Sequence, residues 1–203
     1  MCSRYSFNLP SVDLGFLGID DILSQKPVQQ VVPGQQVWLV RYDEQGTPEL
    51  AQAKWGLAPT WLQDLSRAQI NARVETASES RMFRKAWQDR RCLILADSYF
   101  QWHMAPGNRR QLWRIGARGG SLILMAGLWE RFTVDSTLSF DSCAVLTMPA
   151  MRPLMSIADR MPALLTAAHA GSWLSGAPFD IDRFSASLVS FPFQSQNILK
   201  GRI

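Results

Sequence analysis

The chain has 203 residues, of which 47% are hydrophobic and 19% charged, and a formal net charge of +4. This length allows one domain over residues 1–203 with a sizeable core, and the composition is ordinary for a globular protein. The longest apolar run, residues 122–129, is far too short to cross a bilayer, and the chain shows no signal-peptide pattern. These features exclude a membrane-spanning protein and predict a cytoplasmic one.

Apolar or alternating runs predict strands along the chain. The expected strands cover residues 37–41, 92–96, 111–115, 121–127 and 143–147. They outnumber the expected helices, and the order strand–helix–strand does not repeat. We therefore predict an α+β fold with a mainly antiparallel sheet and a few flanking helices.

Two helices are expected. Thr76 and Glu79 form a capping box, which predicts that a helix starts there, with Arg81 and Arg84 on or beside its polar face. The apolar face of this helix would carry Met82, Phe83, Ala86 and Trp87. A second, less clearly marked helix is expected over residues 166–173.

The three cysteines are too far apart for a disulfide framework or a metal site, and we expect neither a metal nor a cofactor. Cys92 and Cys143 lie in apolar runs, where a buried thiol is expected. Cys2 lies in no such run. Methionine is usually removed before a residue as small as cysteine, and the trimmed chain would begin with an amine and a thiol on adjacent carbons. Such a pair attacks one carbonyl carbon twice and closes a five-membered ring.

Basic residues are concentrated in the middle of the chain. Of the 21 basic residues 17 are arginine, and residues 67–118 hold 11 basic side chains against four acidic ones. Arginine binds phosphate through two parallel hydrogen bonds, so this distribution favours a phosphate-rich partner. The alternative is a solvated basic face. The chain also has eight tryptophans, and exposed tryptophans beside arginines are typical of surfaces that stack on nucleic-acid bases.

Five stretches have unusual sequences, such as a glycine and a proline between two tryptophans, or an arginine in a tight turn that ends in proline. They read WGLAPTW, INARVET, RRCLILADSYFQW, AGLWE and ADRMP, at residues 55–61, 70–76, 90–102, 126–130 and 158–162. With the opening MCSR, they resemble the motifs M-C-G-R, W-G-x-x-P-x-W, N-A-R-x-E-T, R-C-x-x-P-A-D-G-F-Y-E-W, A-G-L-W and H-x-R-M-P of the SOS response-associated peptidase (SRAP) family. They occur in the family's order, and the resemblance implies the barrel-like SRAP fold.

The resemblance also implies an abasic-site processing protein of the DNA damage (SOS) response. Members of the family recognise an abasic site in single-stranded DNA, and their mature N-terminal cysteine condenses with its aldehyde to form a thiazolidine DNA–protein crosslink. Abasic-site lyase and N-terminal self-processing peptidase activities are implied as well. An α-amine has a pKa of about 7.7–8.0 and a thiol one of about 8.5. Cys2 is therefore expected to react near neutral pH if Arg4 and Arg73 supply the modest positive charge that favours its thiolate. We expect a monomer that acts near the nucleoid.

The family's site is carried over position by position. Cys2 would be the nucleophile, and Asn71 would orient the amine or a sugar hydroxyl. The residues expected to bind DNA or line the site are Arg4, Pro59, Trp61, Arg73, Arg81, Arg84, Thr147 and Arg160. We expect Trp61 to stack on a base beside the lesion, a contact worth about 1–3 kcal/mol per base, and Trp55 to pack in the core.

Gln101 and Ala158 are the departures from the family pattern that matter most, because they replace its glutamate and its histidine, which act as acid–base groups. Glutamine cannot transfer a proton at neutral pH, and alanine has no hydrogen-bonding side chain. An acid–base group contributes about 10²–10⁴-fold to rate, so this chain is expected to be slow in steps that need proton transfer. Further departures are Ser3, Gln29, Gln30, Leu95 and Ser98.

His103 offers a replacement if residues 99–103 continue as a strand. Residues two apart in a strand share a face, so His103 would lie beside Gln101. The alternative is a surface histidine before the turn at Pro106 and Gly107. His169 has no motif around it and is given no role.

Two other functions fit parts of the sequence. Glutaminase domains with an N-terminal nucleophile also begin Met-Cys-Gly, but we find no Asn-Gly-Asp-type segment of the kind they carry. The second alternative is a module that binds and shields damaged single strands without turnover, which Gln101 and Ala158 favour. A complex with an abasic oligonucleotide that resists denaturation would separate these readings.

Overall fold

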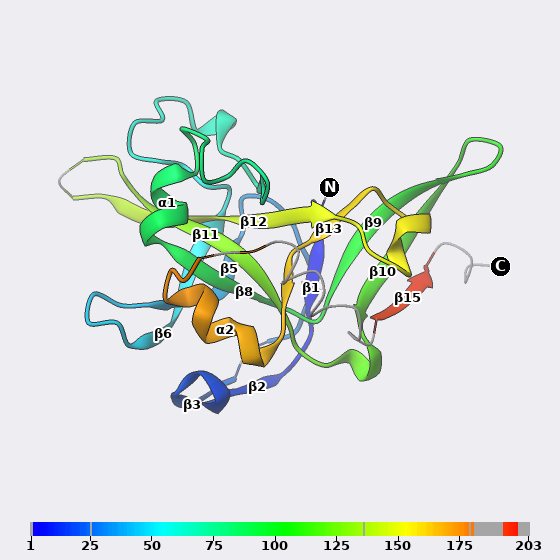
Figure 1. Cartoon of the computed structure of the whole chain (residues 1–203), viewed down its shortest axis with the longest axis horizontal. Coiled ribbons are helices and arrows are strands. Elements are labelled where there is room, and N and C mark those ends of the chain that lie inside the picture. Colours follow the sequence, from blue (N-terminus) through cyan, green and yellow to red (C-terminus); the bar gives the residue numbers. More distant parts are fainter. Residues whose placement is uncertain (1, 25, 136, 179, 181–192, 199–203) are drawn as a thin grey trace.

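The computed structural model describes residues 2–24, 26–135, 137–178, 180 and 193–198 (Figure 1). Its centre is a closed barrel of paired strands. The ring runs in the order β12 (Ser139–Pro149), β6 (Pro48–Trp55), β5 (Gln36–Tyr42), β8 (Arg91–Ala96) and β11 (Ile123–Thr133), and β11 pairs back with β12. The pairs in this ring are antiparallel except β12 with β6, which is parallel. The predicted α+β fold with mainly antiparallel sheet is confirmed.

Short strands extend the barrel at β12 and β11. They are β7 (Asn71–Arg73), which runs parallel to β12, β13 (Arg160–Pro162), antiparallel to β12, and β14 (Leu164–Leu165), antiparallel to β11. The third residue of β7, Arg73, pairs with Thr147, which pairs on its other side with Pro162. Two of the sequence motifs therefore meet across one strand.

A second sheet stands beside the barrel. Its strands follow the order β15 (Phe193–Asn197), β10 (Arg109–Ala117), β9 (Ser98–Ala105), β1 (Tyr5–Phe7) and β4 (Val28–Val31). The β9–β10 hairpin extends away from the body of the molecule at the upper right of Figure 1. A separate hairpin pairs β2 (Ser11–Leu14) with β3 (Ile19–Ser24).

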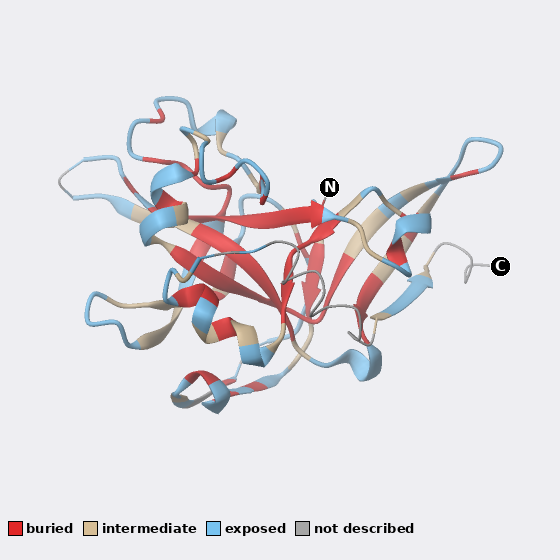
Figure 2. Ribbon diagram, in the orientation of Figure 1, coloured by how far each residue is buried: buried red, intermediate tan, exposed pale blue. Residues whose placement is uncertain are grey.

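The core fills the barrel and the space between the two sheets. Every residue of β8 is buried, and Figure 2 shows burial along most of the barrel strands. Trp55 is 1% exposed, and its indole N–H donates to the Ile70 carbonyl at 2.9 Å. Burying a large apolar side chain stabilises the fold by about 1.5–3 kcal/mol. The predicted core positions of Trp55, Cys92 and Cys143 are confirmed.

The glycine of the AGLWE stretch has a packing role. Gly127 of β11 pairs with Cys92 of β8, and a Cβ atom on Gly127 would lie 2.9 Å from both the Cys92 sulfur and the Ile94 Cδ1. Real Cβ atoms do not approach other atoms so closely. This stretch therefore reflects barrel packing.

Two α-helices lie against the barrel, α1 (Arg84–Asp89) and α2 (Ala167–Leu174). Their tryptophans, Trp87 and Trp173, meet edge to face at 5.6 Å, and the Arg91 guanidinium lies over both rings. Short 3₁₀ helices cover Gly15–Leu17, Leu65–Arg67, Arg118–Gly120 and Leu154–Ser156. Within the described residues, no helix is long and apolar enough to cross a membrane.

The helix predicted to begin at Thr76 begins later, at Arg84. Separate turns cover the intervening segment: the Ser80 N–H donates to the Thr76 carbonyl, and the Arg84 N–H to the Ser80 carbonyl. The Ser80 hydroxyl also accepts from the Met82 N–H at 3.3 Å. A serine that bonds the backbone locally competes with continuous helix, so the predicted capping box is wrong, although Phe83 and Ala86 are buried as expected.

The other predicted elements are present. The expected strands at residues 37–41, 92–96, 111–115 and 143–147 lie within β5, β8, β10 and β12. The strand expected over 121–127 starts at Ile123 and continues to Thr133. The expected second helix corresponds to α2, with Thr166 as its N-cap.

Candidate functional site

The start of the chain is held between the barrel and the second sheet. The Asn71 side-chain amide donates to the Cys2 carbonyl at 2.7 Å. The Phe100 N–H donates to the Arg4 carbonyl at 2.9 Å, which lays the first residues along β9. Cys2 therefore lies beside β7 and β9, and Asn71 contacts its backbone carbonyl; the predicted role of Asn71 in orienting the amine or a sugar hydroxyl stays a prediction.

Asn71 is positioned by the barrel. It opens β7 and pairs with Val145, whose N–H donates to the Ile70 carbonyl at 3.0 Å. Its side-chain nitrogen donates to the Cys2 carbonyl, whereas its Oδ1 is buried with no hydrogen-bond partner among the described residues. A buried acceptor without a partner is uncommon in proteins. It is available to an N–H or O–H group of a ligand beside Cys2.

The Cys2 thiol is buried, with 1% of the residue exposed. Removal from water disfavours the thiolate, and burial raises the pKa of Cys2 to about 12. The expectation that Arg4 and Arg73 would keep thiolate readily available is therefore wrong for this state of the chain. Burial raises the pKa values of the neighbouring Tyr5 and Tyr99. Cys2 lies close enough to both rings to raise these pKa values further.

A groove of about 600 Å³ runs past Gln101 of β9 and Arg73 of β7; neither Cys2 nor Asn71 is among the residues that line it. One wall is β9, from Gln101 to Met104, and the other is the segment from Met155 to Arg160. Arg73, two residues after Asn71, also lines the groove and is exposed. The predicted site residues Arg73, Gln101, Ala158 and Arg160 thus line one groove.

Gln101 is half-buried in this groove. Its Nε2 donates to the Trp102 carbonyl at 3.3 Å, while its Oε1 is buried without a partner in the described part of the chain. Ala158, on the facing wall, is half-buried. His103 lines the same groove, and its Nδ1 lies 3.1 Å from the Ile157 carbonyl oxygen. The conditional prediction that residues 99–103 continue as a strand is confirmed by β9.

Arg160 is already bound to protein groups. Its two terminal nitrogens each donate to the Glu75 carboxylate at 2.8 Å, and they hold the pKa of Glu75 below its ordinary value. Arg160 also donates to the Thr147 hydroxyl at 3.3 Å and to the Thr147 carbonyl at 2.7 Å. Thr147 itself is fully buried. Glu75 is not among the predicted site residues, although it lies in INARVET, two residues after Arg73.

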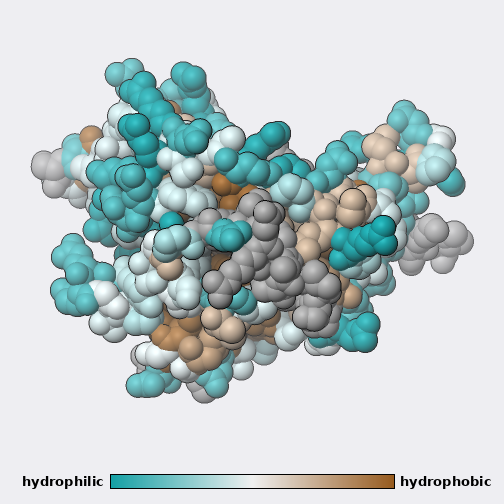
Figure 3. Space-filling model, viewed as in Figure 1, coloured by the Kyte–Doolittle hydropathy of each residue, from teal (hydrophilic) through white to brown (hydrophobic). Residues whose placement is uncertain are grey.

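The other predicted DNA contacts lie on the loops between β6 and α1, outside the lining of the groove. Trp61 is 43% exposed, and the Arg81 guanidinium lies 4.5 Å from the centre of its ring. Arg84 is exposed at the start of α1, whereas Pro59 is buried. These loops are at the upper left of Figure 1, where the surface is mostly hydrophilic (Figure 3). Arg4, in contrast, is half-buried next to Cys2.

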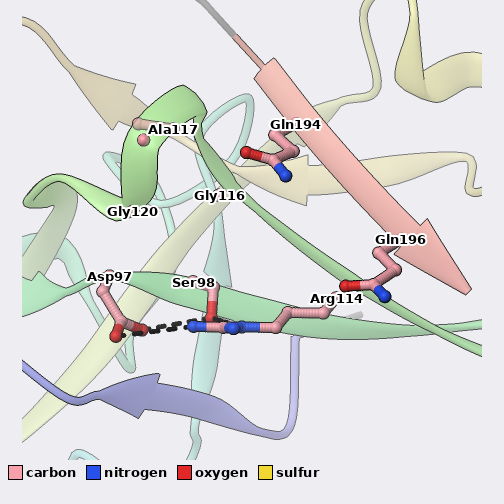
Figure 4. Close-up of a pocket in the computed structure, with 9 residues that line it drawn as sticks. Asp97, Ser98, Arg114, Gly116, Ala117, Gly120, Gln194 and Gln196 are labelled. Carbon is pink, nitrogen blue, oxygen red and sulfur yellow. Dashed lines mark hydrogen bonds and ion pairs between the residues drawn. The ribbon is translucent and has the colours of Figure 1, made fainter. Parts of the chain in front are cut away.

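A buried polar network ties β1 to β9 and β10. Asp97, 4% exposed, accepts hydrogen bonds from the Ser6 hydroxyl, from the Asn8 N–H at 3.0 Å and from the Ser98 hydroxyl at 3.1 Å. Figure 4 shows Arg114 reaching toward Asp97 and Ser98 across a cavity of about 270 Å³. Its Nε donates to the Ser98 hydroxyl at 2.7 Å. The network fixes β1, which follows Cys2 in the chain, against β9, which carries Gln101 and His103.

Gly116 makes this network possible. It pairs with Ser98, and a Cβ atom on it would lie 2.5 Å from the Asp97 carbonyl oxygen. No group of three or more His, Cys, Asp or Glu side chains suited to a metal ion is found among the described residues.

Comparison with known proteins gives consistent matches over nearly the whole chain. The model of the family "SOS response associated peptidase (SRAP)" matches residues 1–199. The chain is 29% identical to abasic site processing protein YoqW of Bacillus subtilis over 205 residues, covering 94% of this chain and 88% of that protein. It is 30% identical to abasic site processing protein YedK of Escherichia coli over 181 residues, covering 86% and 79%.

Solved structures share the fold. A protein from Bordetella bronchiseptica superposes with a TM-score of 0.74 at 23% identity, covering 97% of this chain and 99% of that one. A phage-related protein from the same organism gives a TM-score of 0.72 at 21% identity, covering 97% and 94%. At these identities, the structural likeness establishes the fold alone.

Proposed function

Because the chain belongs to the SOS response associated peptidase (SRAP) family, we propose that it processes abasic sites in single-stranded DNA during the DNA damage response. In this proposal Cys2, freed by removal of Met1, forms a thiazolidine crosslink with the lesion. The observation that carries the proposal is the contact of Asn71 with Cys2 beside a groove that Gln101, Ala158 and Arg73 line. The relatives named as abasic site processing proteins support it.

The proposed reaction needs an amine, a thiol and an aldehyde. The Cys2 amine attacks the aldehyde carbon of the ring-opened sugar, and the electron pair of the broken C=O π bond moves to oxygen. Loss of that oxygen as water leaves a C=N bond. The thiol sulfur then adds to the same carbon, the C=N pair returns to nitrogen, and the ring closes. The sum is one aminothiol and one aldehyde giving one thiazolidine and one water.

The residues around the groove suit this reaction. Asn71 holds the Cys2 carbonyl, and its free Oδ1 is placed to accept from the amine or from a sugar hydroxyl. Arg73 is exposed at the groove, where a guanidinium binds a backbone phosphate. Outside the groove, Trp61 with Arg81 provides a stacking surface for a base of the flanking strand.

We further propose that residues 1–203 act as one domain and as a monomer, in the cytoplasm near the nucleoid. Neither a metal nor a cofactor is needed, because the reaction uses only groups of Cys2 and of the DNA. Abasic-site lyase and N-terminal self-processing steps belong to the same proposal. Gln101 cannot transfer a proton as a glutamate in that position would, so these steps depend on another group.

Crosslinking to an abasic oligonucleotide tests the proposal. The purified protein with Met1 removed should form a product with single-stranded abasic DNA that survives a denaturing gel, and none with undamaged or duplex DNA. Cys2→Ala and Cys2→Ser should abolish the product, since no thiol remains to close the ring. Cys92→Ala, which removes a buried thiol elsewhere, should retain it. Equal crosslinking by Cys2→Ala and the parent would exclude the mechanism.

A module that binds damaged strands without turnover is the second candidate. The burial of Cys2 and the uncharged Gln101 favour it. Under this function the protein would shift abasic single strands on a native gel and release them completely on a denaturing one.

A further inference from the structure

His103 lies on the same face of β9 as Gln101, with its ring in the groove. In a strand, residues two apart point to the same side. Both side chains line the groove, facing the segment from Met155 to Arg160. His103 is half-buried, and its Nδ1 lies 3.1 Å from the Ile157 carbonyl oxygen. The imidazole is therefore held between the two walls of the groove.

This contact determines which nitrogen carries the proton. A carbonyl oxygen only accepts hydrogen bonds, so Nδ1 must be the donor. In the neutral ring Nε2 then keeps its lone pair and can take up a proton. An imidazole fixed in this tautomer is ready to act as a base and, once protonated, as an acid.

Ring closure needs such a base. Burial raises the pKa of the Cys2 thiol to about 12, so the thiol is protonated at neutral pH and must give up its proton as sulfur adds to carbon. Loss of water from the first adduct needs an acid to protonate the departing hydroxyl. Gln101 can do neither, and Ala158 has no polar side-chain atom.

We propose that His103 is the catalytic acid and base of this groove. The inference rests on the proposed crosslinking function and names the group that moves its protons. In the dehydration step, the His103 imidazolium gives its Nε2 proton to the hydroxyl, the C–O bond breaks and water leaves. In the closure step, neutral Nε2 takes the thiol proton while the C–S bond forms and the C=N pair returns to nitrogen. His103 ends the cycle in the protonation state in which it began.

The charged groups that line the groove with His103 are Arg73, Asp159 and Arg160. Arginine stays protonated and cannot serve as a base at neutral pH. Asp159 is an exposed carboxylate on the facing wall and is the rival proton carrier. The experiment must therefore distinguish it from His103.

The test measures single-turnover rates of crosslinking to an abasic oligonucleotide. His103→Asn preserves a side-chain N–H donor toward the Ile157 carbonyl but cannot carry a proton, so its rate should fall by about 10²–10⁴-fold. Binding to a non-reactive abasic analogue should be unchanged. His169→Asn is the matched control, because His169 is the other histidine of the chain. It lies in α2, where its Nδ1 is 2.7 Å from the hydroxyl of the N-cap residue Thr166. This variant should react at the parental rate.

Two rescues separate proton transfer from a structural role. Imidazole added to His103→Ala should raise its rate, whereas it should not change that of the parent. The double variant His103→Asn with Ala158→His returns an imidazole to the residue beside Ile157 and should recover part of the loss.

The outcomes are distinct. A parent that crosslinks through Cys2 and a His103→Asn variant that is equally fast would overturn the role of His103 and leave the proposed function intact. The role of His103 would also be overturned if Asp159→Asn lowered the crosslinking rate and His103→Asn did not. A parent that forms no crosslink overturns both proposals.

Discussion

At the level of single residues, Arg73 and Arg160 bring positive charge to the groove in different ways. Arg73 is exposed, whereas the Arg160 guanidinium donates both terminal nitrogens to Glu75 and is held by Thr147. A guanidinium bound to a carboxylate has little remaining attraction for phosphate. The two arginines are therefore expected to contribute unequally to DNA binding.

Glu75→Gln should strengthen binding to single-stranded DNA, because it removes the carboxylate that neutralises Arg160. Each additional phosphate contact on a single strand changes the slope of log affinity against log salt by about −0.7. Titrations at several salt concentrations should show a steeper slope for Glu75→Gln and a flatter one for Arg73→Ala. Glu79→Gln, which removes an exposed carboxylate of the same loop, is the control. An unchanged slope in Glu75→Gln would mean that Arg160 has a structural role only.

At the level of secondary-structure elements, the position of Cys2 depends on how firmly β1 is attached. β1 is a three-residue strand between β4 and β9, and its Ser6 hydroxyl donates to the buried Asp97. A buried carboxylate that loses a donor becomes costly, by about 1–3 kcal/mol for an unsatisfied group.

Ser6→Ala should therefore lower the free energy of unfolding by about 1–3 kcal/mol. It should also lower the crosslinking rate, because β1 positions Cys2 against β9. Thermal unfolding and single-turnover crosslinking measure the two effects. Ser11→Ala, at an exposed position of β2, should change neither. A Ser6→Ala variant as stable as the parent would show that the network around Asp97 does not secure β1.

The elements best predicted from the sequence are those with continuous apolar patterns. β8 from Cys92 to Ala96 and β12 from Cys143 to Leu146 are buried and apolar at successive positions. β4 and β15, with the sequences VQQV and FQSQN, are edge strands and carry polar residues that no alternation rule detects. The start of α1 was misplaced because the Ser80 hydroxyl bonds the backbone inside the expected helix.

The sequence predicted which residues belong to the candidate site better than it predicted how buried or how paired they are. The motifs identified Cys2, Asn71, Gln101 and Ala158 as site residues. In the structure Asn71 contacts Cys2, and Gln101 and Ala158 line one groove. The burial of Cys2 and the pairing of Arg160 with Glu75 depend on packing between distant segments. A local pattern does not encode such contacts, so neither could be predicted from the sequence.

At the level of the whole molecule, a cluster of charges fastens the barrel strands together. Asp141 of β12 accepts from Arg131 of β11 at 2.8 and 3.0 Å and from Arg41 of β5 at 2.7 Å. Arg41 also donates to Glu49 of β6 at 2.6 Å. Burial alone would raise the pKa of Asp141, but the hydrogen bonds from Arg131 and Arg41 hold it below 3.8.

Stability should depend on this carboxylate in acid. Because the folded pKa of Asp141 is lowered, its contribution is fully present above its ordinary pKa of 3.8 and is lost as the pH falls through the folded value. Asp141→Asn should lower Tm at neutral pH, by about 2–4 °C for each kcal/mol lost. The gap between variant and parent should narrow below pH 3.8. The exposed Asp20→Asn should track the parent throughout, and a gap that stays constant with pH would exclude Asp141 as the source.

The burial of Cys2 has a further consequence for the lifetime of the protein. On the proposed mechanism a molecule that forms the thiazolidine is joined to DNA, and its Cys2 amine and thiol are then occupied. Oxidants and alkylating agents consume thiolates that they can reach. With 1% of Cys2 exposed and its thiol protonated at neutral pH, these reagents find almost nothing to attack. Under the proposed function, burial of the thiol is therefore expected to slow its loss to such reagents until the protein meets a lesion.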